Sequence, residues 1–278
     1  MKYAPAPAPA VDTIDLARRI RVDVLRMVHR TRASHVGSCF SMADMMSVLY
    51  GKILRIDPCE PGNPDRDRVI ISKGHSAAAV YATLANRGFF PREWLEHYAE
   101  NGSLLAGHVS DQVPGIELST GSLGHGLPVG TGMALAARIQ GKQSRTFVIA
   151  SDGECDEGAV WEAALFAGHH GLDNLTLLVD YNKIQSFGRV ADVLRLEPFG
   201  EKWRSFGWAV MELDGHDHHA LAMAMDTLPI ANGKPSVLLC HTVKGKGVSF
   251  MEDKLAWHYK SPDDAQLTQA LNELEPSR

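Results

Sequence analysis

The sequence feature that most constrains the fold is the segment 146–185, in which two apolar runs alternate with polar turns. The runs TFVIA and LTLLVD predict buried strands, and the small-residue stretch between them predicts a helix. A helix that connects two parallel strands brings both strand ends to one edge of a sheet. Asp152 follows the first strand and Asn182 follows the second. We therefore expect both side chains at the edge where open α/β sheets bind their ligands.

Asp152 and Asn182 form a candidate site for a divalent metal. Their oxygens, together with the backbone carbonyl of Ile184, suit an octahedral Mg²⁺ ion that a diphosphate also holds, and Ca²⁺ or Mn²⁺ are alternatives. Gly153 lets the backbone approach such a ligand closely. Asp-Gly and Tyr-Asn-Lys are common turn sequences when each stands alone. Their joint placement at neighbouring strand ends favours a metal site over two separate turns.

Three further apolar runs extend the pattern to five strands. RVIISKG, GWAVMELDG and SVLLCHTVKGKG each predict a strand, and their nearly continuous apolar character indicates burial on both faces. Helices are expected at 11–31, with Asp12 or Thr13 as the N-cap, and at 41–54, with Ser41 as the N-cap. Others are expected over 76–88, 91–100, the later part of 119–142, and 261–278. This alternation predicts the α/β class with a doubly wound parallel sheet.

Composition argues against several classes of protein. The chain has 278 residues, is 45% hydrophobic, and carries 28 Lys and Arg against 33 Asp and Glu, a formal net charge of −5. No basic stripe indicates a nucleic-acid partner, and no apolar run is long enough to cross a membrane. Four cysteines without a CxxC pair are typical of a reducing cytoplasm. We expect an Ala/Pro arm at 1–11, one domain at 12–262, and a C-terminal helix or tail at 263–278.

Four histidines are candidate functional residues because small neighbours surround them. They are His35 in ASHVGS, His75 in SKGHSA, His108 in LAGHVS and His258 in AWHYK. Imidazoles that line one cleft can donate hydrogen bonds and move protons near neutral pH. An ordinary surface or core position explains any single one of them equally well. For the pairs at 169–170 and 218–219 a structural role is favoured, and the spacing predicts no zinc site.

A glycine-rich stretch, GIELSTGSLGHGLPVGTGMA, leads into a predicted helix. Such a loop exposes backbone amides and carbonyls to a flat ring or to an anion. It lacks the Gly-Lys-Ser/Thr of a Walker A loop, and no strand runs directly into a GxGxxG pattern. The stretch therefore indicates a ligand-binding loop without specifying the ligand.

Together these motifs resemble the N-terminal, diphosphate-binding domain of transketolases. The matching segments run in family order from about residue 12 to residue 262. They are ASHVGS, SKGHSAA, LAGHVSDQVPGIELSTGSLGHG, ASDGECDEGAVWEAA with VDYNKIQ, ELDGHD, and VKGKGVSFME with WHYK. IELSTGSLGHG and the Asp-Gly…Asn pairing are specific when they occur together. The resemblance implies the thiamine diphosphate-binding fold, with thiamine diphosphate and Mg²⁺ as cofactors.

The resemblance also implies roles for the matching residues. Asp152, Asn182 and the Ile184 carbonyl would hold the metal, and Gly153 and Glu154 would lie at the diphosphate and metal end. His75 and His258 would lie against the cofactor, and His35 and His108 against the substrate. Gly121, Ser122 and Leu123 would meet the aminopyrimidine through their backbone. Glu157, with Glu162 as a weaker match, resembles the family glutamate that communicates across the subunit interface. An ordinary first-turn carboxylate is the alternative for Glu157. The catalytic candidates are thus His35, His75, His108, His258 and Glu157.

Four positions depart from the family pattern. ASHVGS lacks the Gly before and the Pro after its His that many members have, Ser151 replaces a Gly, and His125 stands where Gln is common. These differences affect the expected sugar specificity rather than the fold.

The resemblance covers one half of the family's catalytic machinery. Family transketolases continue into a pyrimidine-binding domain, which brings the glutamate that protonates the aminopyrimidine and the arginines that hold sugar phosphate. We therefore expect the N-terminal subunit of a two-chain, α2β2 transketolase, which transfers a two-carbon ketol unit between sugars or sugar phosphates. The alternatives are a subunit of a 1-deoxyxylulose-phosphate synthase-like or 2-oxoacid dehydrogenase-like enzyme, or a non-catalytic thiamine diphosphate-binding protein. IELSTGSLGHG and the four histidines favour the first.

Overall fold

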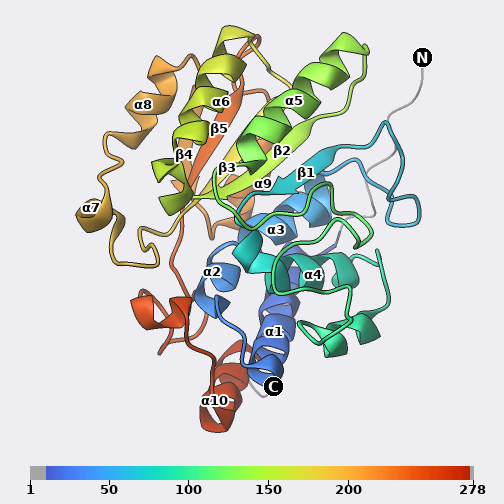
Figure 1. The fold of residues 1–278 in the computed structure, drawn as a ribbon, viewed down its shortest axis with the longest axis vertical. Helices are drawn as coiled ribbons and strands as arrows, with labels where there is room; N and C mark the ends of the chain where they lie inside the picture. The colour runs from blue at the N-terminus through green and yellow to red at the C-terminus, as the bar shows by residue number, and fades with distance from the viewer. Residues whose placement is uncertain (1–10, 276–278) are drawn as a thin grey trace.

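The structure, a computed structural model, describes residues 11–275 as an α/β fold (Figure 1). Its strands are β1 (Arg68–Ile71), β2 (Thr146–Ser151), β3 (Leu175–Tyr181), β4 (Ala209–Asp214) and β5 (Ser236–His241). Its helices are α1 (Thr13–Thr31), α2 (Val36–Ser41), α3 (Ala43–Val48), α4 (Ala77–Asn86), α5 (Gly126–Ile139), α6 (Gly158–His169), α7 (Val190–Val193), α8 (Phe199–Ser205), α9 (His218–Asp226) and α10 (Asp264–Leu274). A π-helical turn at Leu49–Ile53 continues α3. Short 3-10 turns lie at Gly74–Ser76, Arg92–His97, Gly153–Asp156 and Leu255–His258.

The strands form one parallel sheet in the order β1-β2-β3-β5-β4. Ser151 at the end of β2 pairs with Asp180 of β3, and Asp180 pairs with Cys240 of β5. The five predicted strands are thus confirmed, and all of them end at the same edge of the sheet. The segments that carry the candidate site residues leave the sheet at this edge.

Two hydrophobic cores cover the two faces of the sheet. Ile149, Leu178 and Leu238 belong to one cluster, with side chains of α1, α3, α4 and α9. Their neighbours along each strand belong to the other cluster, with side chains of α5, α6 and α8. Successive residues of a strand point to opposite faces, so the two clusters lie on opposite sides of the sheet. In Figure 1, α5 and α6 lie in front of the sheet and α9 lies behind it. The doubly wound arrangement is confirmed.

The start of α1 confirms one of the two predicted N-caps. Asp12 Oδ1 accepts hydrogen bonds from the backbone N–H groups of Ile14 at 2.9 Å and Asp15 at 3.2 Å, which satisfies donors that the helix itself leaves free. The prediction for Ser41 is wrong. Ser41 ends α2, and its hydroxyl donates to the Ser38 carbonyl and to Asp180. Residues 36–41 form a short helix of their own.

Two other expectations from the sequence need correction. The strand in GWAVMELDG was expected to be buried on both faces, but each residue of β4 is partly or fully exposed. The reason is that β4 lies at the end of the sheet and has β5 as its single neighbour. The helix expected over 91–100 is a shorter 3-10 turn at Arg92–His97.

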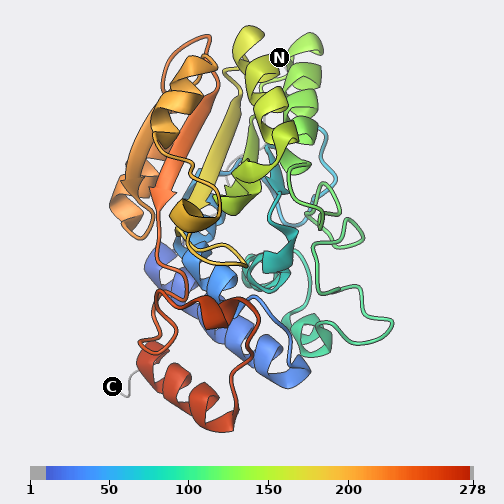
Figure 2. The same cartoon turned by 60° about the vertical axis from the view of Figure 1, so that its left-hand side comes forward.

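The C-terminal helix α10 lies alongside α1, at the end of the molecule opposite α5 and α6 (Figure 2). Asp263 caps α10 in a reciprocal pair with Gln266. Arg18 of α1 donates to Glu275 just beyond α10 at 2.9 Å. The predicted arm at 1–11 lies outside the described residues except for Val11.

None of the helices between residues 11 and 275 combines the length and apolar character needed to cross a membrane. All four cysteines fall in this range and are free thiols, three of them buried.

Candidate active site

The carboxyl edge of the sheet carries a cavity of about 240 Å³. Segments that follow β1, β2, β3 and β5 line it, together with the start of α2 and the Leu255–His258 turn. The lining residues are His35, Ser38, Lys73, His75, Gly121, Leu123, Ser151, Asp152, Gly153, Asn182, Ile184, Gln185, Ser186, Lys244, His258 and Tyr259. The cavity therefore gathers all three predicted metal ligands and three of the four predicted histidines.

Asp152 and Asn182 meet at this edge because the turns after β2 and β3 are hydrogen-bonded to each other. The Asp152 carboxylate accepts from the backbone N–H of Lys183 at 2.5 Å and of Gly153 at 2.7 Å. Asn182 Oδ1 accepts from the N–H of Ile184 at 3.1 Å. Lys183 between them takes a φ of 67°, which turns the chain back toward Asp152. The role of these residues as metal ligands remains a prediction.

The Asp152 carboxyl group is electrostatically uncompensated. Burial, and secondly the charge of Asp180, raise its pKa to about 6, against the two backbone hydrogen bonds, which lower it. Between residues 11 and 275, no Lys, Arg or His lies within ion-pair distance of it. A buried carboxylate with a raised pKa is a group that a divalent cation would stabilise.

A buried ion pair that the sequence did not predict lies beneath the cavity. Lys73 and Asp180 are fully buried, and the Lys73 ammonium donates to the Asp180 carboxylate. Asp180 also accepts from Ser41 Oγ at 2.6 Å, from Asn182 Nδ2 at 3.2 Å, and from the Thr242 hydroxyl. Burial raises the pKa of Asp180, but Lys73 and these donors outweigh it and hold the pKa below the usual value. The pair thereby fixes the Asn182 amide with its oxygen directed away from Asp180.

Lys244 is a third buried side chain at the site that the sequence did not predict. Its buried ammonium donates to the Ile184 carbonyl at 2.9 Å and to His258 Nδ1 at 2.8 Å. Burial, and then the charge of Lys73, lower its pKa to about 8. Both lysines directly precede a glycine just after a strand, and this shared placement was the signal available in the sequence.

The candidate histidines form one group of imidazoles. The ring centroid of His35 lies 5.1 Å from those of His75 and His258, and 6.2 Å from that of His108. His35 has a φ of 74°, and its backbone N–H donates to the backbone carbonyl of His258 at 2.8 Å. The structure thus brings together all four histidines, although His108 is exposed and is not part of the cavity wall.

Three of these imidazoles are neutral at physiological pH. Burial is the main cause, and it lowers the pKa of His35 to about 4 and that of His258 to about 3. The pKa of His75 is also held well below its usual range, first by burial and then by the charge of Lys73. A neutral imidazole offers one donor and one acceptor, so each ring can bind a hydroxyl or pass on a proton.

Glu154 has a different environment from the one its family role implies. Its buried carboxylate accepts from the Ser72 hydroxyl, from Gly124 N–H at 2.8 Å and from Ser151 N–H at 3.2 Å. Burial raises its pKa. It is absent from the cavity lining, and its contacts fasten the glycine-rich loop to the ends of β1 and β2. Direct contact between Glu154 and the cofactor remains a prediction, and the position of this side chain does not support it.

Two further predicted site residues also lie outside the cavity wall. Glu157 is exposed at the start of α6, where its side chain makes no capping hydrogen bond. Ser122 is exposed between Gly121 and Leu123, which do line the cavity. An exposed carboxylate at a helix start can meet a second chain, so the interface role of Glu157 is still open.

The residues present fit a metal ion and a diphosphate. Asp152, Asn182 and the Ile184 carbonyl offer three oxygens on adjoining turns, and oxygens are the ligands that Mg²⁺ takes in proteins. Lys73 and Lys244 bring two ammonium groups to the same cavity, which suits the negative charge of phosphate.

Comparison with known proteins bears out the family resemblance. Residues 12–274 match the model of the family described as "Transketolase, thiamine diphosphate binding domain". One of the subunits of the apulose-4-phosphate transketolase of Phocaeicola vulgatus is 39% identical over 265 residues, which are 95% of this chain and 94% of that protein. The 6-deoxy-6-sulfo-D-fructose transketolase subunit SqwG of a Clostridium species is 41% identical, over 95% of this chain and 97% of that protein.

Solved transketolases share the fold. The crystal structure of transketolase from Campylobacter jejuni superposes with a TM-score of 0.90 at 27% identity and covers 94% of this chain. The chain spans 42% of the length of that transketolase. Sequence and structure agree over nearly the whole of the described chain, and the chain belongs to the transketolase family through its thiamine diphosphate-binding domain.

Proposed function

We propose that the chain is the N-terminal subunit of a two-chain transketolase. One observation carries the proposal: a cavity whose residues suit a metal ion and a diphosphate lies on a chain that matches relatives named as transketolase subunits over 94–97% of their length. The same chain spans 42% of a single-chain transketolase, so a partner would supply the remaining domains. The reaction would transfer a two-carbon ketol unit from a ketose to an aldose.

The chain's own residues would hold one end of thiamine diphosphate. Asp152, Asn182 and the Ile184 carbonyl would bind Mg²⁺ or another divalent cation, and the Gly153 backbone would contact the diphosphate. Gly121, Ser122 and Leu123 would form the rim toward the aminopyrimidine. When bound, thiamine diphosphate supplies the reactive carbon that accepts the ketol unit.

The imidazoles would handle the sugar and its protons. His35 contacts the other three imidazoles and His108 is exposed, and these two residues would bind substrate hydroxyls and the reacting carbonyl. His75 and His258 would lie against the cofactor. Because burial keeps three of these rings neutral, they would orient sugar oxygens without repelling the nearby metal.

The partner would be a C-terminal transketolase subunit that carries the pyrimidine-binding domain, in an α2β2 assembly in the cytoplasm. Exposed Glu157 at the start of α6 would lie at the interface between subunits. The free cysteines support a reducing compartment. The relatives that act on apulose 4-phosphate and on 6-deoxy-6-sulfo-D-fructose make specialised ketoses candidate donors beside the pentose phosphates.

Reconstitution tests the proposal. The chain is purified alone and together with a C-terminal transketolase subunit, and ketol transfer is measured with Mg²⁺ and thiamine diphosphate. We expect turnover from the complex and none from either chain alone. A donor panel of pentose phosphates, the two specialised ketoses and pyruvate separates this activity from the pyruvate-dependent alternatives. Turnover by the chain alone, or turnover of pyruvate but of no ketose, would overturn the proposal.

Cofactor binding tests the metal ligands separately. In the reconstituted complex, Asp152→Ala should abolish Mg²⁺-dependent binding of thiamine diphosphate rather than only slow the reaction, because the diphosphate loses its bridge to the protein. Asp226→Ala, at the exposed end of α9, serves as a surface control for folding. Undiminished Mg²⁺-dependent affinity in Asp152→Ala would contradict the assignment.

A further inference from the structure

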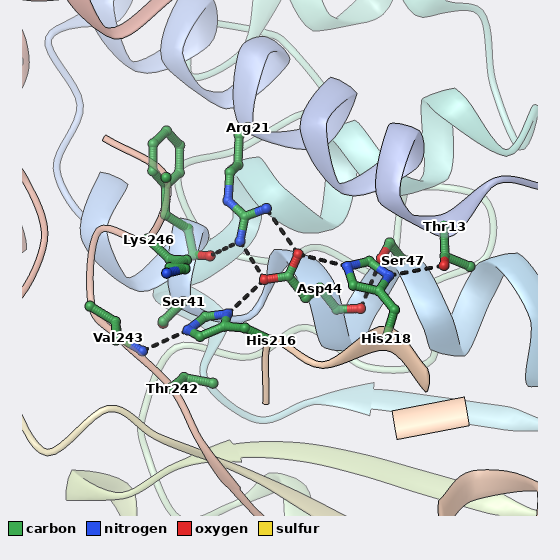
Figure 3. A network of polar contacts seen from close by, with 12 residues as sticks. Thr13, Arg21, Ser41, Asp44, Ser47, His216, His218, Thr242, Val243 and Lys246 are labelled. Atoms are coloured by element: carbon green, nitrogen blue, oxygen red, sulfur yellow. Dashed lines mark hydrogen bonds and ion pairs between the residues drawn. The ribbon is translucent and has the colours of Figure 1, made fainter. Parts of the chain in front are cut away.

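A cluster of buried and partly buried polar side chains connects four segments of the chain (Figure 3). The Asp44 carboxylate of α3 lies at its centre. Arg21 of α1 donates to both carboxylate oxygens, at 3.0 and 2.6 Å. His216, in the turn after β4, contacts Asp44 Oδ2 through Nδ1 at 2.6 Å, and His218 contacts Oδ1 through Nε2 at 3.1 Å. Neither the proposed chemistry nor the sequence motifs explain why this cluster exists.

Asp44 remains a carboxylate within this cluster. Burial raises its pKa, but the hydrogen bonds from His216 and His218 and the charge of Arg21 outweigh burial and hold the pKa far below its usual value. An ionised carboxylate accepts hydrogen bonds and donates none. Each imidazole nitrogen that contacts Asp44 must therefore carry a proton.

His216 differs from His218 in what its second nitrogen does. The backbone N–H of Val243 donates to His216 Nε2 at 2.8 Å, so this nitrogen carries no proton. The proton of the neutral ring lies on Nδ1, directed at Asp44. His218, by contrast, uses its second nitrogen on Thr13 Oγ1 at 2.9 Å, away from the cavity. Asp44 thus fixes the tautomer in which His216 can accept from the backbone.

The backbone that His216 holds leads directly into the cavity. Val243 precedes Lys244, whose ammonium reaches the Ile184 carbonyl and His258 Nδ1. On either side, the Thr242 hydroxyl donates to Asp180, and Gly245 N–H donates to the Gly37 carbonyl at 3.0 Å. Each residue of the segment 242–245 thus has at least one hydrogen bond that anchors it after β5. The anchor at Val243 comes from the side chain of His216, which is not among the residues that line the cavity.

We propose that His216 is a positioning residue that sets the course of segment 242–245 and thereby places the Lys244 ammonium against His258 and the Ile184 carbonyl. Asp44 and Arg21 act on the site through His216 by holding its tautomer. The inference rests on the proposed function only where it concerns cofactor affinity. The geometry of the Lys244–His258 contact belongs to this chain alone.

Three variants separate positioning from simple structural support. In His216→Asn the amide nitrogen takes the place of Nδ1 and can still donate to Asp44, but no acceptor reaches Val243. In His216→Gln the carbonyl oxygen takes the place of Nε2 and can accept from Val243, while the bond to Asp44 is lost. His218→Ala is the matched control, because it also removes a bond to Asp44 and leaves segment 242–245 untouched.

The first measurement uses the purified chain without partner or cofactor. The ¹⁵N resonance of His258 Nδ1 reports the hydrogen bond from Lys244, and melting temperatures are recorded for every variant. We expect this resonance to move in His216→Asn and to stay at its parent position in His216→Gln and His218→Ala. The proposal is overturned if it stays in His216→Asn, or if His216→Gln or His218→Ala moves it. Should His216→Asn fail to fold, a resonance that moves in His216→Gln or in His218→Ala still overturns the proposal.

The second measurement uses the reconstituted complex. Loss of one hydrogen bond that positions Lys244 should raise the KM for thiamine diphosphate about fivefold in His216→Asn, with kcat little changed. The KM should stay within about twofold of the parent in His216→Gln and His218→Ala. If the complex has no ketol-transfer activity, the proposed function fails while the ¹⁵N measurement on the chain still tests His216.

Discussion

Replacing Asp152 by asparagine is expected to make the metal-free chain more stable relative to the parent as the pH rises toward neutral, while removing its affinity for Mg²⁺ and cofactor. The carboxyl group has a pKa of about 6 in the fold, first because of burial and then because of Asp180, against an ordinary value of 3.8. A pKa difference of this size corresponds to about 3 kcal/mol between the two protonation states. The side chain that would hold the metal therefore lowers the stability of the chain whenever it is ionised.

The sign of the effect follows from the raised pKa. The protonated carboxyl group favours the fold fully below about pH 4, and that contribution is lost as the pH rises through about 6. Roughly 1.4 kcal/mol of the loss falls between about pH 5 and about pH 7.5. An asparagine does not titrate, so Asp152→Asn should gain this amount relative to the parent over that interval. The amide also places a donor against Gly153 or Lys183, but this cost is the same at both pH values and cancels.

Urea denaturation in the presence of EDTA measures the effect. The free energy of unfolding is determined for parent and variant at both pH values, and the change in their difference is the quantity of interest. Asp217→Asn is the control: hydrogen bonds from Ala220 and His219 lower the pKa of this exposed N-cap carboxylate, so it titrates below the interval. A difference that does not change with pH, or that changes in favour of the parent at higher pH, would refute the reasoning.

Three other predictions follow from the structure. Gly124→Ala should lower the free energy of unfolding, measured by urea denaturation, by about 1–3 kcal/mol. Gly124 has a φ of 84°, and a Cβ at this position would lie 2.7 Å from the Cβ of Glu157. An unchanged free energy of unfolding would contradict this prediction. Asp67→Asn should lower the free energy of unfolding by about 3–5 kcal/mol in the same assay, because the fully buried Asp67 carboxylate forms ion pairs with both Arg55 and Arg145. A decrease below about 1 kcal/mol would show that the two arginines find other partners. In the reconstituted enzyme, His35→Ala and His108→Ala should each lower kcat/KM about tenfold or more. The control His97→Ala, at a residue that does not line the cavity, should leave kcat/KM unchanged. Unchanged turnover in both His35→Ala and His108→Ala would favour a non-catalytic binding protein.

The fold could be predicted from the sequence because each strand is an apolar run bounded by turn residues. All five predicted strands occur, and the crossover between β2 and β3 brings Asp152 and Asn182 together as expected. The strand order could not be predicted, since nothing in the sequence of GWAVMELDG marks β4 as the end of the sheet. Its apolar residues are half-exposed because pairing partners, rather than composition, decide how much of a strand is covered.

The candidate site was predictable where a residue type has few other uses. A histidine among small residues, or an Asp-Gly after a strand, indicates a functional residue, and the structure places both kinds of residue in one cavity. The sequence did not indicate a role for Lys73, Lys244 or Asp180, because a lysine or aspartate at the end of a strand is normally solvated. Their burial depends on contacts between residues as far apart as Lys73 and Asp180, which no local pattern encodes.

The backbone hydrogen bond from His35 to the His258 carbonyl joins two segments that lie, in the sequence, before the first strand and after the last strand of the sheet. During synthesis this bond cannot form until the ribosome has released the chain as far as residue 258. By then every strand has been made, so the sheet can assemble on the nascent chain while the cavity stays open on the side of Lys244 and His258. Polypeptides from ribosomes that stop earlier would carry the apolar strands without the residues that close the cavity.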